Sequence, residues 1–368
     1  MKIRKIELYE MPVRLKKPFV ISLGAFYFAN NVVVVIHTED GLTGFGECSP
    51  FMSINGESME TGMVVGKFLA QKLLGMDPVK VEKCSKAMDD VIFANNSIKS
   101  AFDMALYDIA SQAAGLPLFS YLGGKNDKAL VTDYTVSLGD KYQMAEDALQ
   151  IKRDGFQVIK VKLGEAGEKD VERIRLIRKA VGYDIPVRID ANQGWDAASV
   201  IQTLESLARF DIQHCEEPIP RWDFMELPQI REKSPIPIMA DESCCDHHDA
   251  KRLIALNACD LLNVKLGKSS GIFKALKIIQ LAEEAGMKIQ VGGFLESRLG
   301  FTASAHLALT SKNIVWCDFD TPLMFTEDPV SGGITYNQQG VISVPDVPGL
   351  GAWIDSDILK KLSGIVID

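Results

Sequence analysis

Apolar positions follow two different patterns along the chain, and the change falls near residue 118. In the first part, strand-like stretches with alternating apolar residues precede three stretches with helical spacing. The predicted strands and helices span residues 3–10, 31–38, 41–47, 58–74, 79–91 and 95–114. We therefore predict a small α+β capping domain over residues 1–118.

From about residue 130, short β-branched runs alternate with amphipathic helices. Eight runs are predicted as strands: 131–138, 158–163, 187–192, 213–217, 236–241, 261–266, 288–292 and 314–320. Strands that alternate with helices in this way fit an α/β fold, a (β/α)8-type (TIM) barrel, better than an open sheet. We assign the barrel to residues 119–320 and expect the Gly- and Pro-rich segment 321–368 to return to the capping domain.

Composition and charge indicate which partners and which cellular location to expect. The 368 residues are 47% hydrophobic and 24% charged, as in ordinary globular enzymes. A net charge of −9 opposes non-specific binding to nucleic acid or an anionic membrane, so we predict neither partner. Seven cysteines lack zinc-site spacing, and the charged start Met1–Glu7 lacks the apolar core of a signal peptide. We predict a cytoplasmic protein that forms a homo-oligomer.

Polar residues end successive barrel strands, where the active sites of such barrels lie. Asp190, Glu216 and Asp241 end the third to fifth predicted strands, one strand–helix repeat apart. Lys162 and Lys265 hold the same position on the second and sixth strands. Three carboxylates without His or Cys form an oxygen-rich site, which predicts one hard divalent cation, Mg²⁺, per active site.

The lysines point to proton transfer. Lys160 and Lys162 share one strand face, and we expect repulsion and burial to lower a lysine pKa toward the range of a general base. Lys265 lies four strands away, so it faces Lys162 across the barrel mouth. A metal-held carboxylate makes the adjacent C–H easier to ionise because the metal stabilises the enediolate. Two lysines could remove the proton from one face and return it to the other, which gives the epimer.

These residues resemble those of the enolase superfamily, within it the muconate-lactonizing-enzyme subgroup. The resemblance covers nearly the whole chain, including the motifs Lys160-Val-Lys162, Asp190-Ala-Asn192, Glu216-Glu-Pro218, Asp241-Glu-Ser243 and Asn263-Val-Lys265. It implies Asp190, Glu216 and Asp241 as metal ligands and Lys162 and Lys265 as the acid/base pair. It also implies that Lys160 tunes Lys162 and contacts the substrate carboxylate. Asn192 and Glu242 are expected beside the metal ligands.

The last strand carries a second resemblance. Asp318-Phe-Asp320 resembles the Asp-x-Asp motif of dipeptide epimerases similar to alanyl-glutamate epimerase. Its spacing would aim both carboxylates at one point, and a protonated α-amino group is their natural partner. This favours a dipeptide over the substrates of N-acylamino acid racemases and o-succinylbenzoate synthases, which lack that ammonium. The alternative is an Asp pair that caps a loop.

The side chain of the substrate is predicted from a position at which this sequence differs from alanyl-glutamate epimerases. The resemblance places an arginine in the loop after the first strand of alanyl-glutamate epimerases, where Gly24 stands here. No Lys or Arg occurs between Pro18 and Asn31, and a buried acidic side chain without a partner is costly. We predict an L-Ala-L-X dipeptide with an uncharged, hydrophobic X. The expected pocket residues are Gly24, Phe19, Phe26, Thr135 and Phe294.

Three points stay open at the level of sequence. A Schiff-base lysine aldolase would use one barrel lysine, but it gives the three carboxylates and the Asp pair no role. A binding barrel without catalytic activity is a third reading. Glu296 could line the site or pair with Arg298.

Overall fold

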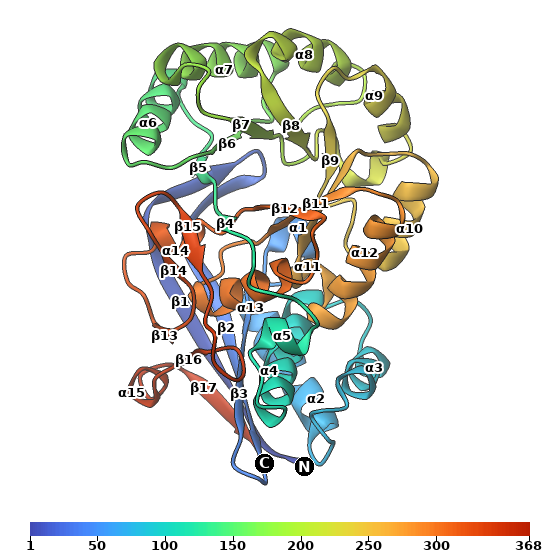
Figure 1. Cartoon of the computed structure of the whole chain (residues 1–368), viewed down its shortest axis with the longest axis vertical. Helices are drawn as coiled ribbons and strands as arrows, with labels where there is room; N and C mark the ends of the chain where they lie inside the picture. Colours follow the sequence, from blue (N-terminus) through green and yellow to red (C-terminus); the bar gives the residue numbers. More distant parts are fainter.

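The computed structural model describes residues 1–368, with the barrel in the upper half of Figure 1 and the capping domain in the lower half. The barrel sheet contains eight parallel strands that neighbour one another in chain order. They are β5 (Tyr134–Val136), β6 (Ile159–Lys162), β7 (Val187–Asp190), β8 (Ile212–Glu216), β9 (Ile238–Ala240), β10 (Leu261–Lys265), β11 (Lys288–Gly292) and β12 (Ile314–Cys317). The predicted barrel is confirmed.

Helices separate these strands, and each is amphipathic or buried as the sequence pattern requires. The longer ones are α6 (Lys141–Arg153), α7 (Gly167–Val181), α8 (Val200–Leu207), α9 (Leu227–Lys233), α10 (His247–Ala255), α12 (Ile272–Glu284) and α13 (Arg298–Ala308). Shorter pieces are α11 (Leu266–Ser269), η1 (Ala208–Phe210) and η2 (Arg221–Asp223). Asp140 begins α6 by accepting hydrogen bonds from the Tyr142 and Gln143 amides.

The barrel closes between its last strand and the residues that precede its first. Thr132 and Cys317 form a parallel bridge, and the Asp133 amide donates to the Cys317 carbonyl oxygen over 3.3 Å. The helix that directly follows β12, α14 (Thr321–Met324), has only four residues. The eighth repeat therefore has no long helix, which refines the predicted (β/α)8 pattern.

The capping domain is built on an antiparallel sheet in the order β17-β1-β2-β3. Its elements are β1 (Ile3–Ile21), β2 (Gly24–Thr38), β3 (Thr43–Cys48), α1 (Met52–Asn55), α2 (Met59–Leu73), α3 (Val81–Val91), α4 (Asn96–Ala113), α5 (Leu118–Tyr121) and β17 (Gly364–Ile367). The C-terminal strand thus pairs with the N-terminal one. Small elements lie between the capping domain and the barrel. They are β4 (Leu130–Val131), β13 (Val330–Gly332), β14 (Thr335–Tyr336), β15 (Val341–Ser343), β16 (Ala352–Ile354) and α15 (Ser356–Leu359).

The first hairpin is longer than predicted. The stretch expected as a loop after residue 10 continues the strands, and Ile21 pairs with Gly24 at the tip. Gly24 has φ +143°, a backbone region that glycine adopts without a steric penalty. In Figure 1 the hairpin reaches up from the cap to the barrel rim. There the Ser22 hydroxyl donates to the Asn192 carbonyl over 2.7 Å, and the Leu138 amide donates to Val20.

A second contact joins the cap to the loop after β11. Asn31 donates its side-chain amide to the Leu295 carbonyl over 2.8 Å. The buried carboxylate of Glu47 accepts hydrogen bonds from the Ser297 and Gly300 amides. The cap therefore contacts three segments of the barrel rim, the loops after β5, β7 and β11.

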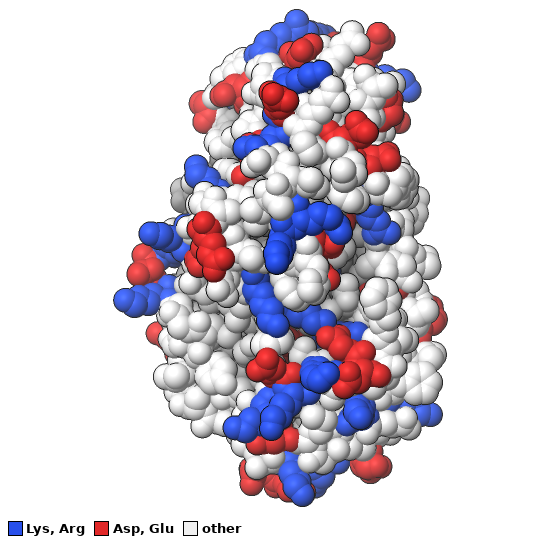
Figure 2. Space-filling model, turned by 90° about the vertical axis from the view of Figure 1, so that its right-hand side faces the viewer, with Lys and Arg blue, Asp and Glu red and all other residues white.

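The outer surface mixes both signs of charge. Figure 2 shows Lys and Arg side chains interspersed with Asp and Glu over one face of the molecule. All seven cysteines carry free thiols. No helix combines the length and apolar character that crossing a membrane requires.

Candidate active site

Three acidic side chains meet at the carboxyl ends of the central barrel strands. Asp190 and Glu216 are the last residues of β7 and β8 and are register partners. Asp241 follows β9 directly. All three are fully buried. Because parallel strands end at one rim, their regular spacing in sequence becomes proximity in space.

Lysine ammonium groups neutralise these carboxylates. Lys162 lies 2.6 Å from Asp190, and Lys265 lies 2.7 Å from Asp241. Lys160 lies deeper, 3.3 Å from Asp190 and 2.8 Å from Glu216. Ionised carboxylates are tolerable in the barrel interior because each has a cation within contact distance.

The expected lowering of a lysine pKa is wrong for Lys160. Burial by itself lowers the pKa of Lys160, but Asp318, Glu216 and Asp190 outweigh it and raise the pKa well above its usual value. Burial also opposes Asp241 and Glu216 at Lys265, whose pKa is likewise raised. The sequence argument counted the neighbouring lysine and missed the facing carboxylates, which lie within 3.3 Å of the Lys160 ammonium.

The structure adds residues to which the sequence reasoning gave no role at the site. Lys268 is buried and contacts Asp241 Oδ1 at 2.5 Å. Asn263 and Gln290 donate their side-chain amides to the two oxygens of Glu216, over 2.8 and 3.2 Å. Asn263 stands two residues before Lys265 on the same strand face, so its spacing was the available signal.

Asn192 and Glu242 lie beside the carboxylates, as expected. The Asn192 amide N–H donates to Asp190 Oδ1 over 2.8 Å, and its side chain donates to Glu242 over 3.2 Å. Asn192 holds φ +40°, an uncommon conformation for a residue other than glycine. Burial, then Asp241, raises the pKa of Glu242 well above its usual value. The strained turn directs the Asn192 amide toward Asp190.

Asp318 and Asp320 follow β12 rather than lying in it, so the predicted strand geometry is wrong for this pair. The chain turns after Cys317, and the two carboxylates take different partners. Asp318 contacts Lys160 at 2.8 Å, and Asp320 accepts the Thr135 amide over 2.6 Å. Burial would raise the pKa of Asp318, but Lys160 and Lys162 lower it to about 2. Burial, then Asp318, raises the pKa of Asp320 to about 7.

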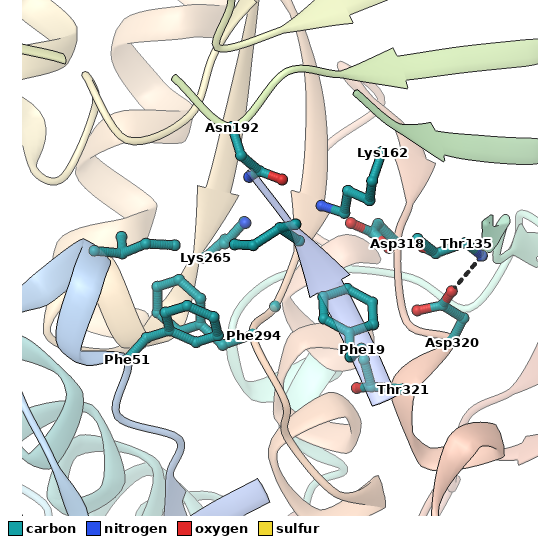
Figure 3. A pocket seen from close by; sticks show the side chains of 13 residues that line it. Phe19, Phe51, Thr135, Lys162, Asn192, Lys265, Phe294, Asp318, Asp320 and Thr321 are labelled. Carbon is teal, nitrogen blue, oxygen red and sulfur yellow. Dashed lines mark hydrogen bonds between the residues drawn. The ribbon is translucent and has the colours of Figure 1, made fainter. Parts of the chain in front are cut away.

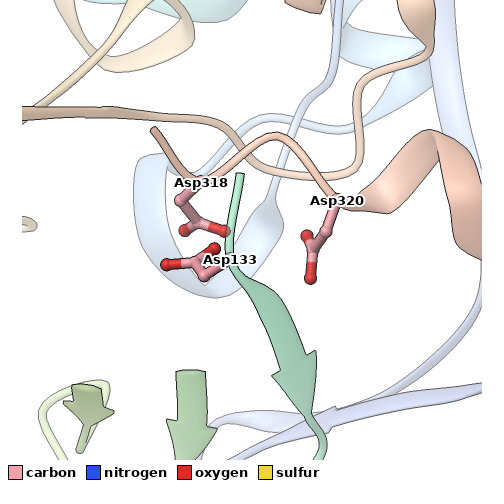
Figure 4. Close-up of side chains that lie close together, drawn as sticks. All are labelled: Asp133, Asp318 and Asp320. Atoms are coloured by element: carbon pink, nitrogen blue, oxygen red, sulfur yellow. The ribbon is translucent and has the colours of Figure 1, made fainter. Parts of the chain in front are cut away.

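Asp133 completes an acidic cluster with these two residues. Figure 4 shows Asp133 beside Asp318, with Asp320 to one side. One oxygen from each of the three lies within 4.8 Å of the others. Arg188 contacts Asp133 at 2.8 Å, so this cluster already contains an arginine and, through Asp318, a lysine.

A small cavity separates the two catalytic candidates Lys162 and Lys265. Figure 3 shows their ammonium groups pointing toward each other from opposite sides. The volume of this cavity is about 30 Å³, which is room for about one or two water molecules. The lining residues are Phe19, Ile21, Phe51, Ile54, Thr135, Lys162, Asn192, Lys265, Gly293, Phe294, Asp318, Asp320 and Thr321.

Aromatic rings form one wall of this cavity. The Phe19 ring lies 5.6 Å from Lys162 Nζ, and the Phe294 ring lies 5.1 Å from Lys265 Nζ. Phe51, which directly precedes α1 of the cap, stacks on Phe294 at 5.5 Å. Phe26 packs behind Phe51 at 4.4 Å, and Gly24 is at the exposed hairpin tip, so neither of these predicted residues is part of the lining.

Glu296 follows neither of its two predicted alternatives. It is absent from the cavity lining, and Arg298 instead contacts Asp328 at 2.5 Å. The Glu296 carboxyl accepts a hydrogen bond from the Phe294 amide and lies near Glu47. Burial, then Glu47, raises its pKa to about 8. Glu296 therefore supports Phe294 from behind.

The chemistry of the donor set fits Mg²⁺ at Asp190, Glu216 and Asp241. All three offer only oxygen, which hard cations prefer. Asp241 is fully buried, and its two carboxylate oxygens form ion pairs with Lys265 and Lys268.

The fold and the site define a two-domain barrel enzyme with an acidic centre and paired lysines. A model described as mandelate racemase / muconate lactonizing enzyme, N-terminal domain, matches residues 4–123. A model described as enolase C-terminal domain-like matches residues 143–358. The chain belongs to the mandelate racemase/muconate lactonizing enzyme family of the enolase superfamily, as its motifs predicted.

Individual relatives are dipeptide epimerases. The chain is 57% identical to a D-Ala-D/L-Ala epimerase of Cytophaga hutchinsonii, with 100% of both chains covered. The crystal structure of a dipeptide epimerase from that organism, with Mg and D-Ala-L-Val, covers 100% of both chains with a TM-score of 0.99. A hydrophobic dipeptide epimerase of Enterococcus faecalis is 36% identical over 95% of this chain and 99% of its own. An L-Ala-D/L-Glu epimerase of Bacillus subtilis is 40% identical over 98% of this chain and 99% of its own.

Proposed function

We propose that the protein is a Mg²⁺-dependent dipeptide epimerase that inverts the α-carbon of the C-terminal residue. The observation that carries this proposal is the pair of ammonium groups, Lys162 and Lys265, on opposite sides of one cavity. A carbon placed between them presents one face to each lysine, which is the geometry that two-base inversion requires.

Each lysine serves one face of that carbon. Lys162 and Lys265 exchange the roles of base and acid with the direction of the reaction. Lys160, which lies at 3.3 Å or less from Asp190, Glu216 and Asp318, supplies positive charge near the substrate carboxylate. Bound at Asp190, Glu216 and Asp241, Mg²⁺ would supply Lewis-acid stabilisation of the charge that develops on that carboxylate. The lysines share their carboxylate partners with this cation, so cation binding and lysine protonation oppose each other.

The two ends of the cavity define the two ends of the substrate. Asp318 and Asp320 line this cavity, and they would bind the α-ammonium group of the N-terminal residue by charge-assisted hydrogen bonds. Phe19, Phe51 and Phe294 offer apolar surface to the side chain of the C-terminal residue. The lining contains no arginine, which supports an uncharged, hydrophobic residue at that position.

Substrate entry requires movement of the cap. The cavity of about 30 Å³ is too small for a dipeptide. Phe19 and Ile21 from the hairpin form part of its wall, so displacement of the hairpin would open it. We assign the hairpin to a capping domain of residues 1–118, completed by 321–368, over a catalytic barrel of residues 119–320. The seven free thiols support a reducing, cytoplasmic location.

Hydrogen exchange during turnover tests the proposal. L-Ala-L-X dipeptides are incubated in D₂O with Mg²⁺, and deuterium at the α-carbon is read by mass spectrometry. Exchange and inversion of hydrophobic X, abolished by EDTA and restored by Mg²⁺, are the expected results. Exchange of N-acylated amino acids alone would remove the role of Asp318 and Asp320, and best exchange of L-Ala-L-Glu would contradict the predicted side chain. Labelling by borohydride with a carbonyl substrate would support an aldolase instead.

A further inference from the structure

Asp318 and Asp320 lie in a short segment that belongs to neither a strand nor a helix. The segment follows β12 and ends where α14 begins. Both side chains are buried, and one oxygen of each lies within 4.8 Å of one from the other (Figure 4). Two ionised carboxylates at that distance repel each other in a buried site, so the segment must be held by other contacts. The residue between them, Phe319, makes these contacts.

Phe319 is held at three points. Its amide donates a hydrogen bond to the Thr132 hydroxyl over 2.8 Å, and its carbonyl oxygen accepts one from the Tyr336 hydroxyl over 2.7 Å. Its side chain is fully buried, and its ring lies 5.0 Å from the ring of Phe301 on α13. The two peptide groups that flank Phe319 are planar and both are hydrogen-bonded, so they fix how the two neighbouring aspartates lie relative to each other.

The two hydroxyl groups come from one small sheet with the strand order β14-β15-β4. Tyr336 of β14 pairs with Ile342 of β15, and Ile342 pairs in turn with Leu130 of β4. Thr132 directly follows β4, and its amide donates to the Gly340 carbonyl oxygen over 2.9 Å. The returning C-terminal segment therefore contacts the part of the barrel that carries the two aspartates.

We propose that Tyr336 and Thr132 are positioning residues for substrate binding, which keep the two aspartates at the spacing that the substrate ammonium group requires. The proposal rests on the epimerase function proposed above. Neither residue lines the cavity between the lysines, so each acts on the substrate through the Phe319 peptide groups. Because proton transfer belongs to the lysines, loss of either hydroxyl should weaken dipeptide binding and leave the proton-transfer step intact.

Tyr336→Phe removes the hydroxyl and keeps the ring. It should raise KM for L-Ala-L-Ala by about tenfold, because the buried Phe319 carbonyl loses its donor, and change kcat by less than about twofold. N-propionyl-L-alanine is L-Ala-L-Ala without the ammonium group, and its α-hydrogen exchange in D₂O should change by less than about twofold. The matched control is Tyr9→Phe, which removes a hydroxyl that donates to Glu7 at an equally half-buried position in the cap. It should leave KM unchanged.

Thr132 supplies a second test with its own rescue variant. Thr132→Val should raise KM as Tyr336→Phe does, whereas Thr132→Ser keeps a hydroxyl and should stay within about twofold of wild type. An unchanged KM in either Tyr336→Phe or Thr132→Val, whichever folds, would overturn the inference. Equal losses for L-Ala-L-Ala and N-propionyl-L-alanine would do the same. In these cases wild type still epimerises dipeptides and the proposed function stands. If no dipeptide reacts with wild type, the proposed function itself fails.

Discussion

The two sides of the active site are built alike around their lysines. On one side, Lys162 contacts Asp190 at 2.6 Å, and on the other Lys265 contacts Asp241 at 2.7 Å. In both pairs the carboxylate comes from the strand or strand end that neighbours the lysine's own strand. A reaction that runs in both directions through one carbon needs two such comparable groups. The similarity therefore reflects the chemistry and not the sequence, since the two lysines stand in different motifs.

The two sides differ in which domain supplies the phenylalanine ring that lies over the lysine. Phe19 over Lys162 belongs to the cap hairpin, whereas Phe294 over Lys265 belongs to the barrel loop after β11. Opening of the hairpin would expose Lys162 to water and leave Lys265 covered. Of the two proposed proton-transfer groups, Lys162 is thus covered by the cap and Lys265 by the barrel.

Removing each lysine gives the largest expected effect. Lys162→Ala and Lys265→Ala should each lower epimerisation by about a thousandfold or more, because an acid/base group is lost. Each variant should still exchange the α-hydrogen of one enantiomer with D₂O, and the two should retain opposite enantiomers. NMR of L-Ala-L-Ala and L-Ala-D-Ala in D₂O measures this. Loss of the same enantiomer's exchange in both variants would contradict the two-sided arrangement.

The strand-end residues were predictable because they follow the strand–helix repeat. Asp190, Glu216 and Asp241 recur at regular intervals, so a correct barrel assignment places them at one rim without knowledge of any contact. The pKa direction of Lys160 was not predictable in this way. It depends on distances to carboxylates on other strands, and these follow from how the strands are staggered.

The apolar wall was only partly accessible from sequence. Phe19 and Phe294 could be named from the sequence. Phe51 directly precedes the four-residue helix α1, and it reaches the site only because the cap docks on the barrel. Phe26 was expected to line the site and packs behind Phe51 instead. Side chains that reach a site by docking leave no periodic signal in the sequence.

The pH dependence of the unfolding free energy reports on Glu296, which lies beside Phe294 on the Lys265 side of the site. Its raised pKa of about 8 means that folding takes up a proton, so its stabilising contribution is lost as pH rises from about 4.5 to about 8. Glu296→Gln keeps an acceptor for the Phe294 amide and does not titrate. The unfolding free energy of wild type should fall relative to this variant by about 2 kcal/mol between about pH 6.5 and 8.

Urea unfolding at several pH values measures that difference. The control is Glu205→Gln, at an exposed position on α8, whose curve should run parallel to wild type. A Glu296→Gln curve that also ran parallel would show that Glu296 is already ionised in the folded protein. In that case Phe294 would be held beside a charged group, and the two sides of the site would differ more than the geometry indicates.

Substituting the aromatic rings that lie over the two lysines should distinguish the Lys162 side of the site from the Lys265 side. Phe19→Leu and Phe294→Leu keep apolar bulk but lose the ring over the ammonium group, which costs about 1–2 kcal/mol in a desolvated site. Both should lower kcat/KM by about tenfold. Only Phe19→Leu should speed amide exchange at the hairpin tip, because only Phe19 belongs to the hairpin. Equal protection in both variants would show that the hairpin is held without this ring.

The smallest effect is expected at the contact between hairpin and barrel. Ser22→Ala removes the hydrogen bond to the Asn192 carbonyl, a loss of about 1 kcal/mol. If cap closure contributes to substrate binding alone, KM should rise by about fivefold while kcat stays constant. Ser137→Ala is the control, since Ser137 lies in the loop facing the hairpin and has no hydrogen bond to Asn192. A fall in kcat without a change in KM would mean that Asn192, and through its amide Asp190, depends on the closed hairpin for its position during proton transfer.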